Sequence, residues 1–287
     1  MKARILPVLF LCAAAFFPQA AAAFESPSIK LSSSTVVQGE PVLVTFAGVA
    51  ATSTIRRATF DGTTLGLFVY RGAVSALIGI DLYKKAGTYK ISATLSDGTN
   101  FESYLTVAAR TKVEAPLGIP EKLGGNTTKS QATLVSTLAS ENAELARIKT
   151  GTKSFWTESF RLPLKNPIVT DSYGYSRQTG AYSIAHKGTD FRAKEGVAVM
   201  AVNRGVVRIA KTYRNYGKTV VVDHGLGVMS FYMHLSKIHV SVGQLVLPNQ
   251  TVGLSGMTGY AEQPHLHLTI RINGTSIDPM VFFGLLQ

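Results

Sequence analysis

Cysteine is almost absent from this 287-residue sequence, and the one cysteine, Cys12, lies inside an apolar run near the N-terminus. If that run is removed on export, the mature chain has no thiol, which excludes a disulfide framework, a cysteine nucleophile and cysteine metal ligands. A long apolar run is missing too. The stretch from Ile5 to Phe17 has about 13 residues, whereas a helix that spans a bilayer needs roughly 20. We therefore expect no integral membrane span.

The first residues instead read as an export signal. Lys2 and Arg4 give a positive start, the apolar stretch follows, and Pro18 and the alanines at 20 to 23 come after it. We predict that residues 1–23 are a signal peptide cleaved near Ala23. The protein is then exported, and acts in the periplasm or in the extracellular space at the cell wall.

Acidic residues are scarce, with 17 Asp and Glu against 29 Lys and Arg. Loss of Lys2 and Arg4 with the signal would leave 27 basic residues and a net charge of +10. A basic exported protein concentrates at polyanions, and the bacterial wall is one. The basic residues are scattered and no nucleic-acid recognition motif is present, so we expect no nucleic-acid partner. We expect a monomer.

The remaining length predicts about two domains, both mainly β. Between residues 24 and 110, short alternating apolar segments are separated by turn residues, which predicts an immunoglobulin-like β-sandwich. Alternation is clear in Val42 to Phe46, Leu65 to Val69, Tyr89 to Leu95 and Phe101 to Val107. This region has no histidine and no carboxylate cluster, so we assign it no chemistry. A spacer, a wall-binding module and a cover for a catalytic groove all remain open.

Residues 111–158 are predicted to be a linker that contains one amphipathic helix. Prolines and a Gly-Gly pair between Thr111 and Thr128 predict a segment without regular structure. Leucines at helical spacing between Ser130 and Lys149, with Gly151 just beyond, predict a helix that packs against a neighbouring domain.

Residues 159–287 are strand-rich and punctuated by glycines, which is typical of compact antiparallel sheets. The expected strands are Val197 to Val202, Val206 to Ala210, Thr219 to Asp223, Val228 to Met233 and Leu266 to Ile272.

No histidine precedes Lys165, and four of the six that follow fall into three short motifs. The segment from His186 to Asp190 reads HKGTD, that from Tyr232 to Leu235 reads YMHL, and that from Pro264 to Leu268 reads PHLHL. Nitrogen and oxygen ligands of this kind suit zinc, and a catalytic zinc keeps three protein ligands and an open position for water.

Side chains alternate along a strand, so His265 and His267 face the same way. Spacing alone leaves open which of them joins His186 and Asp190 as the third ligand. We interpret His224 and His239 as structural histidines. Ser255 is followed at once by glycine and does not fit a nucleophile elbow, so we read it as part of a tight turn.

Taken in order, these motifs resemble the lysostaphin/LytM-type zinc metallopeptidases, which cut the peptide cross-links of bacterial cell walls. The resemblance covers about Pro163 to Pro279 and includes the segment from Gly253 to Gly259, which reads GLSGMTG. It implies a mostly antiparallel β domain with one Zn²⁺ at the floor of a groove. By resemblance the metal ligands are His186, Asp190 and His267.

The other two histidines are then the catalytic residues. A neutral His265 beside the metal-bound water would accept its proton as a general base. His234, placed nearby by the resemblance, would hydrogen-bond the oxyanion that develops on the scissile carbonyl. Tyr232 is predicted to line the groove as a substrate-binding residue, with a position in the core as the alternative.

The predicted function is a zinc-dependent endopeptidase that hydrolyses peptidoglycan cross-links, with stem peptides and cross-bridges as its partners. One alternative is a regulator, because some relatives lack the zinc ligands and dock onto amidases. The other is a structural wall-binding protein. Every ligand position is filled here, which argues against the regulator. A further hypothesis is latency, in which the predicted helix and the loop from Tyr173 to Tyr182 restrict access to the groove.

Overall fold

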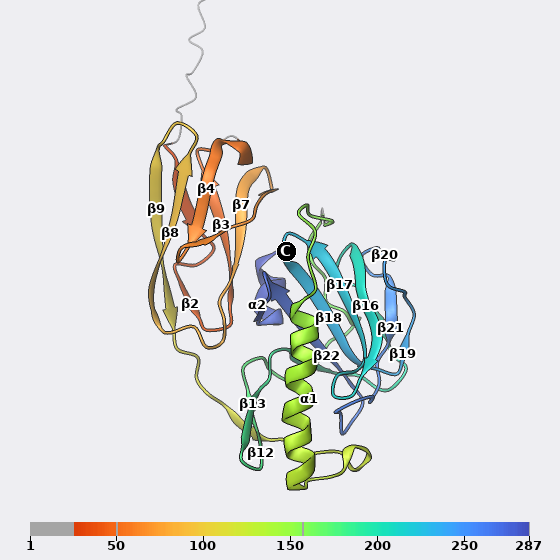
Figure 1. Ribbon diagram of the computed structural model, residues 1–287. Helices are drawn as coiled ribbons and strands as arrows, with labels where there is room; N and C mark the ends of the chain where they lie inside the picture. The colour runs from red at the N-terminus through yellow and green to blue at the C-terminus, as the bar shows by residue number, and fades with distance from the viewer. Residues whose placement is uncertain (1–25, 50, 157, 287) are drawn as a thin grey trace, which may run out of the picture.

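The computed structural model describes residues 26–49, 51–156 and 158–286. The predicted signal peptide, with Cys12, lies outside the described residues. Two β domains lie side by side, and the long helix α1 (Thr128–Ala146) stands in front of the larger one (Figure 1). In the described part of the chain, no helix has the length and apolarity needed to cross a membrane.

The N-terminal domain is a sandwich of two sheets. The first has the order β1 (Ser28–Leu31), β3 (Pro41–Ala47), β7 (Ala73–Gly79) and β6 (Leu67–Tyr70). The second has the order β2 (Thr35–Val37), β9 (Asn100–Ala108), β8 (Gly87–Leu95), β4 (Ile55–Phe60) and β5 (Thr63–Thr64), and the 3₁₀ turn η1 (Thr52–Thr54) leads into β4. The predicted sandwich is present, and its one departure from antiparallel pairing among the described strands is β2 beside β9.

Alternating residues of the sandwich fill its core, as the pattern predicted. Val42, Val44 and Phe46 of β3 are buried between the two sheets. In β6, however, Val69 is 62% exposed and Phe68 is buried. The outer face of this sheet is covered by the C-terminal domain, because Phe68 packs edge-on against Trp156 with ring centroids 5.3 Å apart.

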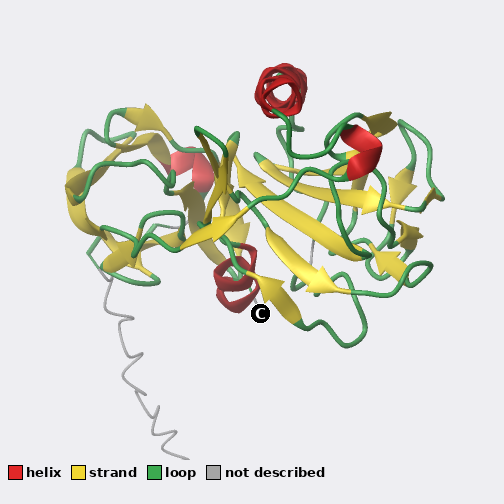
Figure 2. Cartoon of the chain, turned by 90° about the horizontal axis from the view of Figure 1, so that it is seen from below, coloured by secondary structure: helices red, strands yellow, loops and turns green. Residues whose placement is uncertain are grey.

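The contact between the domains is both apolar and polar. The short helix α2 (Pro279–Leu285) lies between the sandwich and the C-terminal sheet (Figure 2). Arg110 donates to the backbone carbonyl of Gln38 over 2.7 Å and forms an ion pair with Asp278 over 3.2 Å. The Asp278 amide donates to the Gly39 carbonyl over 2.7 Å, and the Arg110 guanidinium carbon lies 5.3 Å from the centroid of the buried Tyr173 ring. The sandwich is therefore packed against the C-terminal domain and not tethered loosely to it.

The segment between the domains is more ordered than predicted. It contains the strand β10 (Glu114–Pro116) and the 3₁₀ turn η2 (Glu121–Leu123), so the prediction of no regular structure is wrong there. β10 forms because its backbone pairs in parallel with β12 (Ser176–Thr179), an interaction invisible to local sequence. The helix predicted over Ser130 to Lys149 is confirmed as α1, capped by the Thr127 side chain, which accepts from the Ser130 amide over 3.2 Å.

The C-terminal domain is built on one large sheet and two small ones. The large sheet has the order β11 (Val169–Asp171), β14 (Thr189–Arg192), β22 (His265–Ile272), β18 (Val228–Leu235), β17 (Gly217–Gly225), β16 (Gly205–Tyr213) and β20 (Leu245–Val246), with β23 (Thr275–Ile277) beside β22. The small sheets are β15 (Ala198–Met200), β21 (Thr251–Leu254) and β19 (Lys237–Ile238), and β10, β12 and β13 (Tyr182–Ala185). The expected mainly β fold is confirmed.

The two faces of the large sheet have different roles. One face buries residues such as Val220, Val222 and Leu268 in the main core. On the other face, Leu145 of α1 packs in a second cluster with Phe231 and its neighbours. The same face carries His265 and His267 of β22, so α1 lies beside the histidines.

Candidate active site

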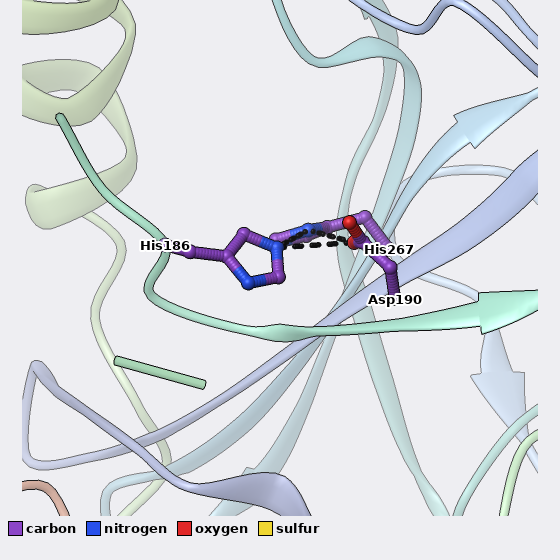
Figure 3. A group of neighbouring side chains, drawn as sticks. All are labelled: His186, Asp190 and His267. Atoms are coloured by element: carbon purple, nitrogen blue, oxygen red, sulfur yellow. Dashed lines mark hydrogen bonds and ion pairs between the residues drawn. The ribbon is translucent and has the colours of Figure 1, made fainter. Parts of the chain in front are cut away.

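Two neighbouring strands bring the ligand motifs together. Asp190 of β14 stands opposite His267 of β22 in the antiparallel register, although 77 residues separate them in sequence. His186 lies on the turn that leads into β14 and points at the same spot (Figure 3). A Cβ atom on Gly188 would overlap His267 Nε2, so glycine is needed at this position for the close approach.

The three predicted ligands form a compact cluster. His267 Nδ1 is 2.7 Å from Asp190 Oδ1, and His186 Nε2 is 3.1 Å from both of these atoms. Ligands about 2.05 Å from a tetrahedral zinc would lie about 3.3 Å apart, so a few tenths of an ångström of spreading would admit the ion. Two imidazoles and one carboxylate therefore fit zinc in both donor chemistry and spacing.

Hydrogen bonds behind the ligands orient both imidazoles. His186 Nδ1 donates to the Ser172 carbonyl over 2.9 Å, which leaves the lone pair of Nε2 facing the cluster. His267 uses the opposite nitrogen: its Nε2 donates to Thr269 Oγ1 over 3.0 Å, and that hydroxyl donates to the Lys187 carbonyl over 3.0 Å. Such contacts set the tautomer of a metal-binding histidine.

The carboxylate is oriented by a cation. Arg177 of β12 lies 3.4 Å from Asp190 Oδ2 through Nη2 and also forms an ion pair with Asp171. Burial alone would raise the pKa of Asp190, but the adjacent His186 and His267 lower it well below its usual range. Asp190 is therefore a carboxylate at neutral pH. The sequence interpretation missed Arg177, which no local motif marks, and Thr269, which the alternation after His267 places on the same face.

His265 and His234 flank the cluster without joining it. His265 Nε2 is 3.8 Å from Asp190 Oδ1, and its Nδ1 donates to the Gln263 carbonyl over 2.8 Å. The rings of His234 and His265 are 4.8 Å apart. His234 Nδ1 donates to the Thr258 carbonyl over 2.9 Å, and burial, followed by the neighbouring His265, lowers the pKa of His234 to about 3. Both rings thus present a bare Nε2 as an acceptor.

A bulge in β18 turns His234 toward the groove. Strict alternation would place Met233 on the groove face and His234 on the core face. The register between β17 and β18 shifts at this point, and His234 adopts a left-handed backbone with φ of 61°. Both side chains then line the groove. Because a residue with a Cβ rarely adopts this backbone, its presence beside the cluster favours a functional role.

The cluster lies in a hollow of about 700 Å³. Its walls come from α1, the segment before it, β12, β13 and the loop before β22. Wall residues include Leu117, Leu134, Leu138, Asn142, Arg177, Ile184, Tyr216, Tyr260 and Glu262. α1 therefore borders the groove, as the latency hypothesis requires. Of the loop named in that hypothesis, Arg177 lines the groove, but Tyr173 packs against Arg110 and Gly39 of the sandwich.

Tyr232 does not line the groove, so its prediction as a substrate-binding residue is wrong. The side chain is fully buried in the main core, and its hydroxyl accepts from the Val202 amide over 2.9 Å. Alternation along β18 points Tyr232 away from the histidine face. The alternative core position is the one observed.

The remaining candidates behave as structural residues. His224 is fully buried, its Nδ1 donates to the Arg204 carbonyl over 2.8 Å, and its Nε2 contacts Ser230 Oγ over 2.8 Å. Ser255 Oγ donates to the Lys194 carbonyl over 2.6 Å, which is a structural role. The predicted tight turn is wrong, because Gly253 and Leu254 belong to β21 and Gly256 pairs with His265. His239 lies at the surface outside the groove.

Comparison with known proteins supports the resemblance. Residues 184–279 match Peptidase family M23, and this segment contains all three predicted ligands together with His234 and His265. Among curated relatives, the peptidoglycan DD-endopeptidase ShyA of Vibrio cholerae is 41% identical over 95 residues, which are 33% of this chain and 22% of the relative. The murein hydrolase activator EnvC of Escherichia coli is 33% identical over 132 residues, 46% of this chain and 29% of the relative.

The chain thus spans less than a third of the length of these curated relatives. A solved structure from Pseudomonas aeruginosa, assigned to peptidase M23, matches more broadly: it is 27% identical, with a TM-score of 0.57, over 88% of this chain and 96% of that one. A match of this extent includes the N-terminal domain as well.

Proposed function

We propose that this chain, which carries an M23 peptidase domain, is a zinc-dependent endopeptidase that hydrolyses the peptide cross-links of bacterial peptidoglycan. One observation carries the proposal: His186, Asp190 and His267 converge within 3.1 Å, and two further histidines face them with bare nitrogens. Curated relatives named as peptidoglycan endopeptidases support the choice of substrate.

The residues that would hold zinc are His186 Nε2, Asp190 Oδ1 and His267 Nδ1. Zinc bound there would supply a Lewis acid that polarises the scissile carbonyl and lowers the pKa of a water molecule toward about 7. The chain prepares the ligands in advance through Ser172, Thr269 and Arg177, as described above.

His265 is suited to accept the proton of the attacking water. Its Nδ1 is held by the Gln263 carbonyl, so the neutral ring presents the lone pair of Nε2 toward the ligand cluster. A base in this position would take the proton during attack and deliver it to the leaving amine. His265 stays off the ligand set because His267, and not His265, contacts Asp190 and His186 directly.

His234 is proposed to stabilise the oxyanion on the scissile carbonyl. With Nδ1 donating to Thr258, its Nε2 must gain a proton before it can donate to an oxygen. That proton would be the one that His265 takes from water, held between the two rings, whose centroids are 4.8 Å apart, until it passes through His265 to the leaving amine. Because His234 is buried, donation from its ring would stabilise developing charge more than donation in bulk solvent would.

A second candidate function is regulation without catalysis, favoured by the likeness to a protein named as a murein hydrolase activator. The filled ligand set opposes it. We also propose export to the periplasm or cell wall, since the substrate lies there and the N-terminal residues read as a signal.

The test is digestion of purified sacculi followed by mass spectrometry of the released muropeptides. We expect cross-linked muropeptides to be converted to uncross-linked ones, with inhibition by a chelator and recovery on addition of zinc. A His265→Ala variant with full zinc content should hydrolyse sacculi about 10²- to 10⁴-fold more slowly. Zinc-free protein that cannot be loaded, or hydrolysis seen only when a separate amidase is added, would favour the regulator.

A further inference from the structure

The groove face of β22 carries a row of polar side chains that continues beyond the metal cluster, the candidate zinc site formed by His186, Asp190 and His267. His265, His267, Thr269 and Arg271 alternate with core residues, so all four point to the same side of the sheet. At about 3.3 Å per residue, Arg271 lies about 13 Å along the strand from His267. Arg271 takes no part in the proposed mechanism of hydrolysis.

Arg271 is half-buried and lacks an acidic partner. Its Nε donates to Ser276 Oγ over 3.3 Å, and its guanidinium carbon lies 4.5 Å from the centroid of the Phe231 ring. Within the described ranges, no carboxylate forms an ion pair with it. Burial lowers the pKa of Arg271, and the opposing effect comes from the neighbouring Tyr216 and not from a carboxylate. An arginine stays charged even so, and an unpaired charge in such a place is costly.

The other cations of the groove are differently placed. Arg177 is neutralised by Asp171 and Asp190. Lys187 lies over the ring of Tyr83, 5.0 Å from its centroid. Arg192, opposite His265 at the other end of the row, is exposed to solvent. Arg271 is therefore the half-buried cation available to a ligand at its end of the groove.

The guanidinium is also open to the groove. Arg271 lines both the hollow of about 700 Å³ that holds the metal cluster and a neighbouring hollow of about 440 Å³ beneath the end of α1. None of its nitrogens is among the buried, unpaired polar atoms of the described residues, so the nitrogens without a partner reach solvent in these hollows. A ligand that extends from the metal cluster along β22 would meet them.

We propose that Arg271 binds a free carboxylate of the substrate peptide and makes the groove selective for acidic stem peptides over neutral cross-bridges. The proposal rests on the proposed peptidase function. A guanidinium pairs with a carboxylate through two parallel hydrogen bonds, which match its planar geometry. Extended chain advances about 3.3 to 3.6 Å per residue, so the carboxylate would lie three to four residues from the cleaved bond, or closer on a long side chain.

The test uses synthetic cross-linked stem peptides and the zinc-loaded full chain. One substrate keeps all its carboxylates, and in each of the others a single carboxylate is replaced by a carboxamide. We expect amidation at one position to lower kcat/KM by roughly 10- to 100-fold for the wild type. In Arg271→Gln this acid preference should fall to near unity, and Arg271→Lys should retain part of it.

Arg204→Gln is the matched control, because Arg204 is an exposed arginine of the same domain outside the groove. It should keep the wild-type preference. A wild type that cleaves every amidated substrate as well as the acid overturns the proposal, and this result needs no variant to fold. A preference that survives in Arg271→Gln overturns it too. If no substrate is cleaved by any protein, the proposed function itself fails.

Discussion

Replacing Thr269 by valine should weaken zinc binding without touching a ligand. The Thr269 hydroxyl, 4% exposed as a residue, accepts from His267 Nε2 and donates to the Lys187 carbonyl, each over 3.0 Å. Valine has nearly the same shape, so the core is undisturbed while both hydrogen bonds are lost. His267 then has no partner that holds its ring with Nδ1 toward the cluster.

The size of the effect follows from these two contacts. Loss of an outer partner of a metal-binding histidine typically lowers metal affinity about 10- to 100-fold. The metal-free protein should lose about 1–3 kcal/mol of unfolding free energy as well, because a buried N–H is left without an acceptor. The two effects are separated by measuring zinc affinity by competition with a chromophoric chelator, and stability by urea unfolding of the metal-free protein.

Two control variants make the result specific. Thr269→Ser keeps the hydroxyl and should bind zinc nearly as tightly as the wild type. Thr212→Val makes the same change at an exposed position of β16 and should alter neither quantity. Equal zinc affinity in Thr269→Val and the wild type would refute the role assigned to this hydroxyl, as would an equal loss in Thr269→Ser.

Three further predictions concern the histidines and the helix. His265→Ala and His234→Ala should each lower sacculus hydrolysis about 10²- to 10⁴-fold at unchanged zinc content, and loss of zinc instead would contradict their assignment outside the ligand set. Burial lowers the pKa of His224 from 6.5 to about 4. The unfolding free energy should therefore keep its full value above pH 6.5, fall by about 3 kcal/mol as the pH drops to 4, and level off below that. Urea unfolding of metal-free His224→Gln should show a shallower fall with pH, and a pH dependence equal to that of the wild type would refute this. Leu145→Ala removes a buried contact between α1 and the sheet, which should weaken the packing of the helix by about 2–5 kcal/mol. If the helix restricts the groove, sacculus hydrolysis should become faster, whereas an unchanged rate would reject latency.

The candidate metal site was predicted partly from local pattern and partly from resemblance, because the pairing of β14 with β22 that joins His267 to Asp190 spans 77 residues of sequence. Alternation along one strand put His265 and His267 on the same side, and Gly188 leaves the space that His267 occupies beside His186 and Asp190. The same alternation explains why Tyr232 does not line the groove. It predicts that Tyr232 and Met233 lie on opposite faces of the sheet, but the sequence does not indicate which of the two faces borders the groove.

Other features depend on contacts between distant segments. β10 becomes a strand because β12 offers an edge, and Phe68 is buried because Trp156 covers the outer face of the sandwich. His234 was identified by resemblance, yet regular alternation would have turned it toward the core. The bulge with φ of 61° that redirects it arises from the pairing of β17 with β18, which no window of sequence around His234 reveals.

The hydrogen-bond acceptors around the four clustered histidines fix which ring nitrogens carry a lone pair. They separate the two predicted metal ligands, His186 and His267, from the two histidines that flank them. His186 and His267 aim a lone pair at Asp190, each from a different ring nitrogen, because the Ser172 carbonyl and Thr269 Oγ1 accept a hydrogen bond from the N–H of the other nitrogen. His265 is held in the same way by a backbone carbonyl but stands 3.8 Å from Asp190 Oδ1.

This arrangement also orders the proton movements. His234 donates its Nδ1 proton to Thr258, so a neutral His234 can only accept at Nε2 and cannot stabilise an oxyanion. If His234 acts as the proposed oxyanion donor, a proton must first reach the pair of His234 and His265, and in the proposed mechanism this is the proton released by the attacking water. In that mechanism the base and the oxyanion donor would be successive states of one pair of rings 4.8 Å apart, and removal of either ring should impair both steps.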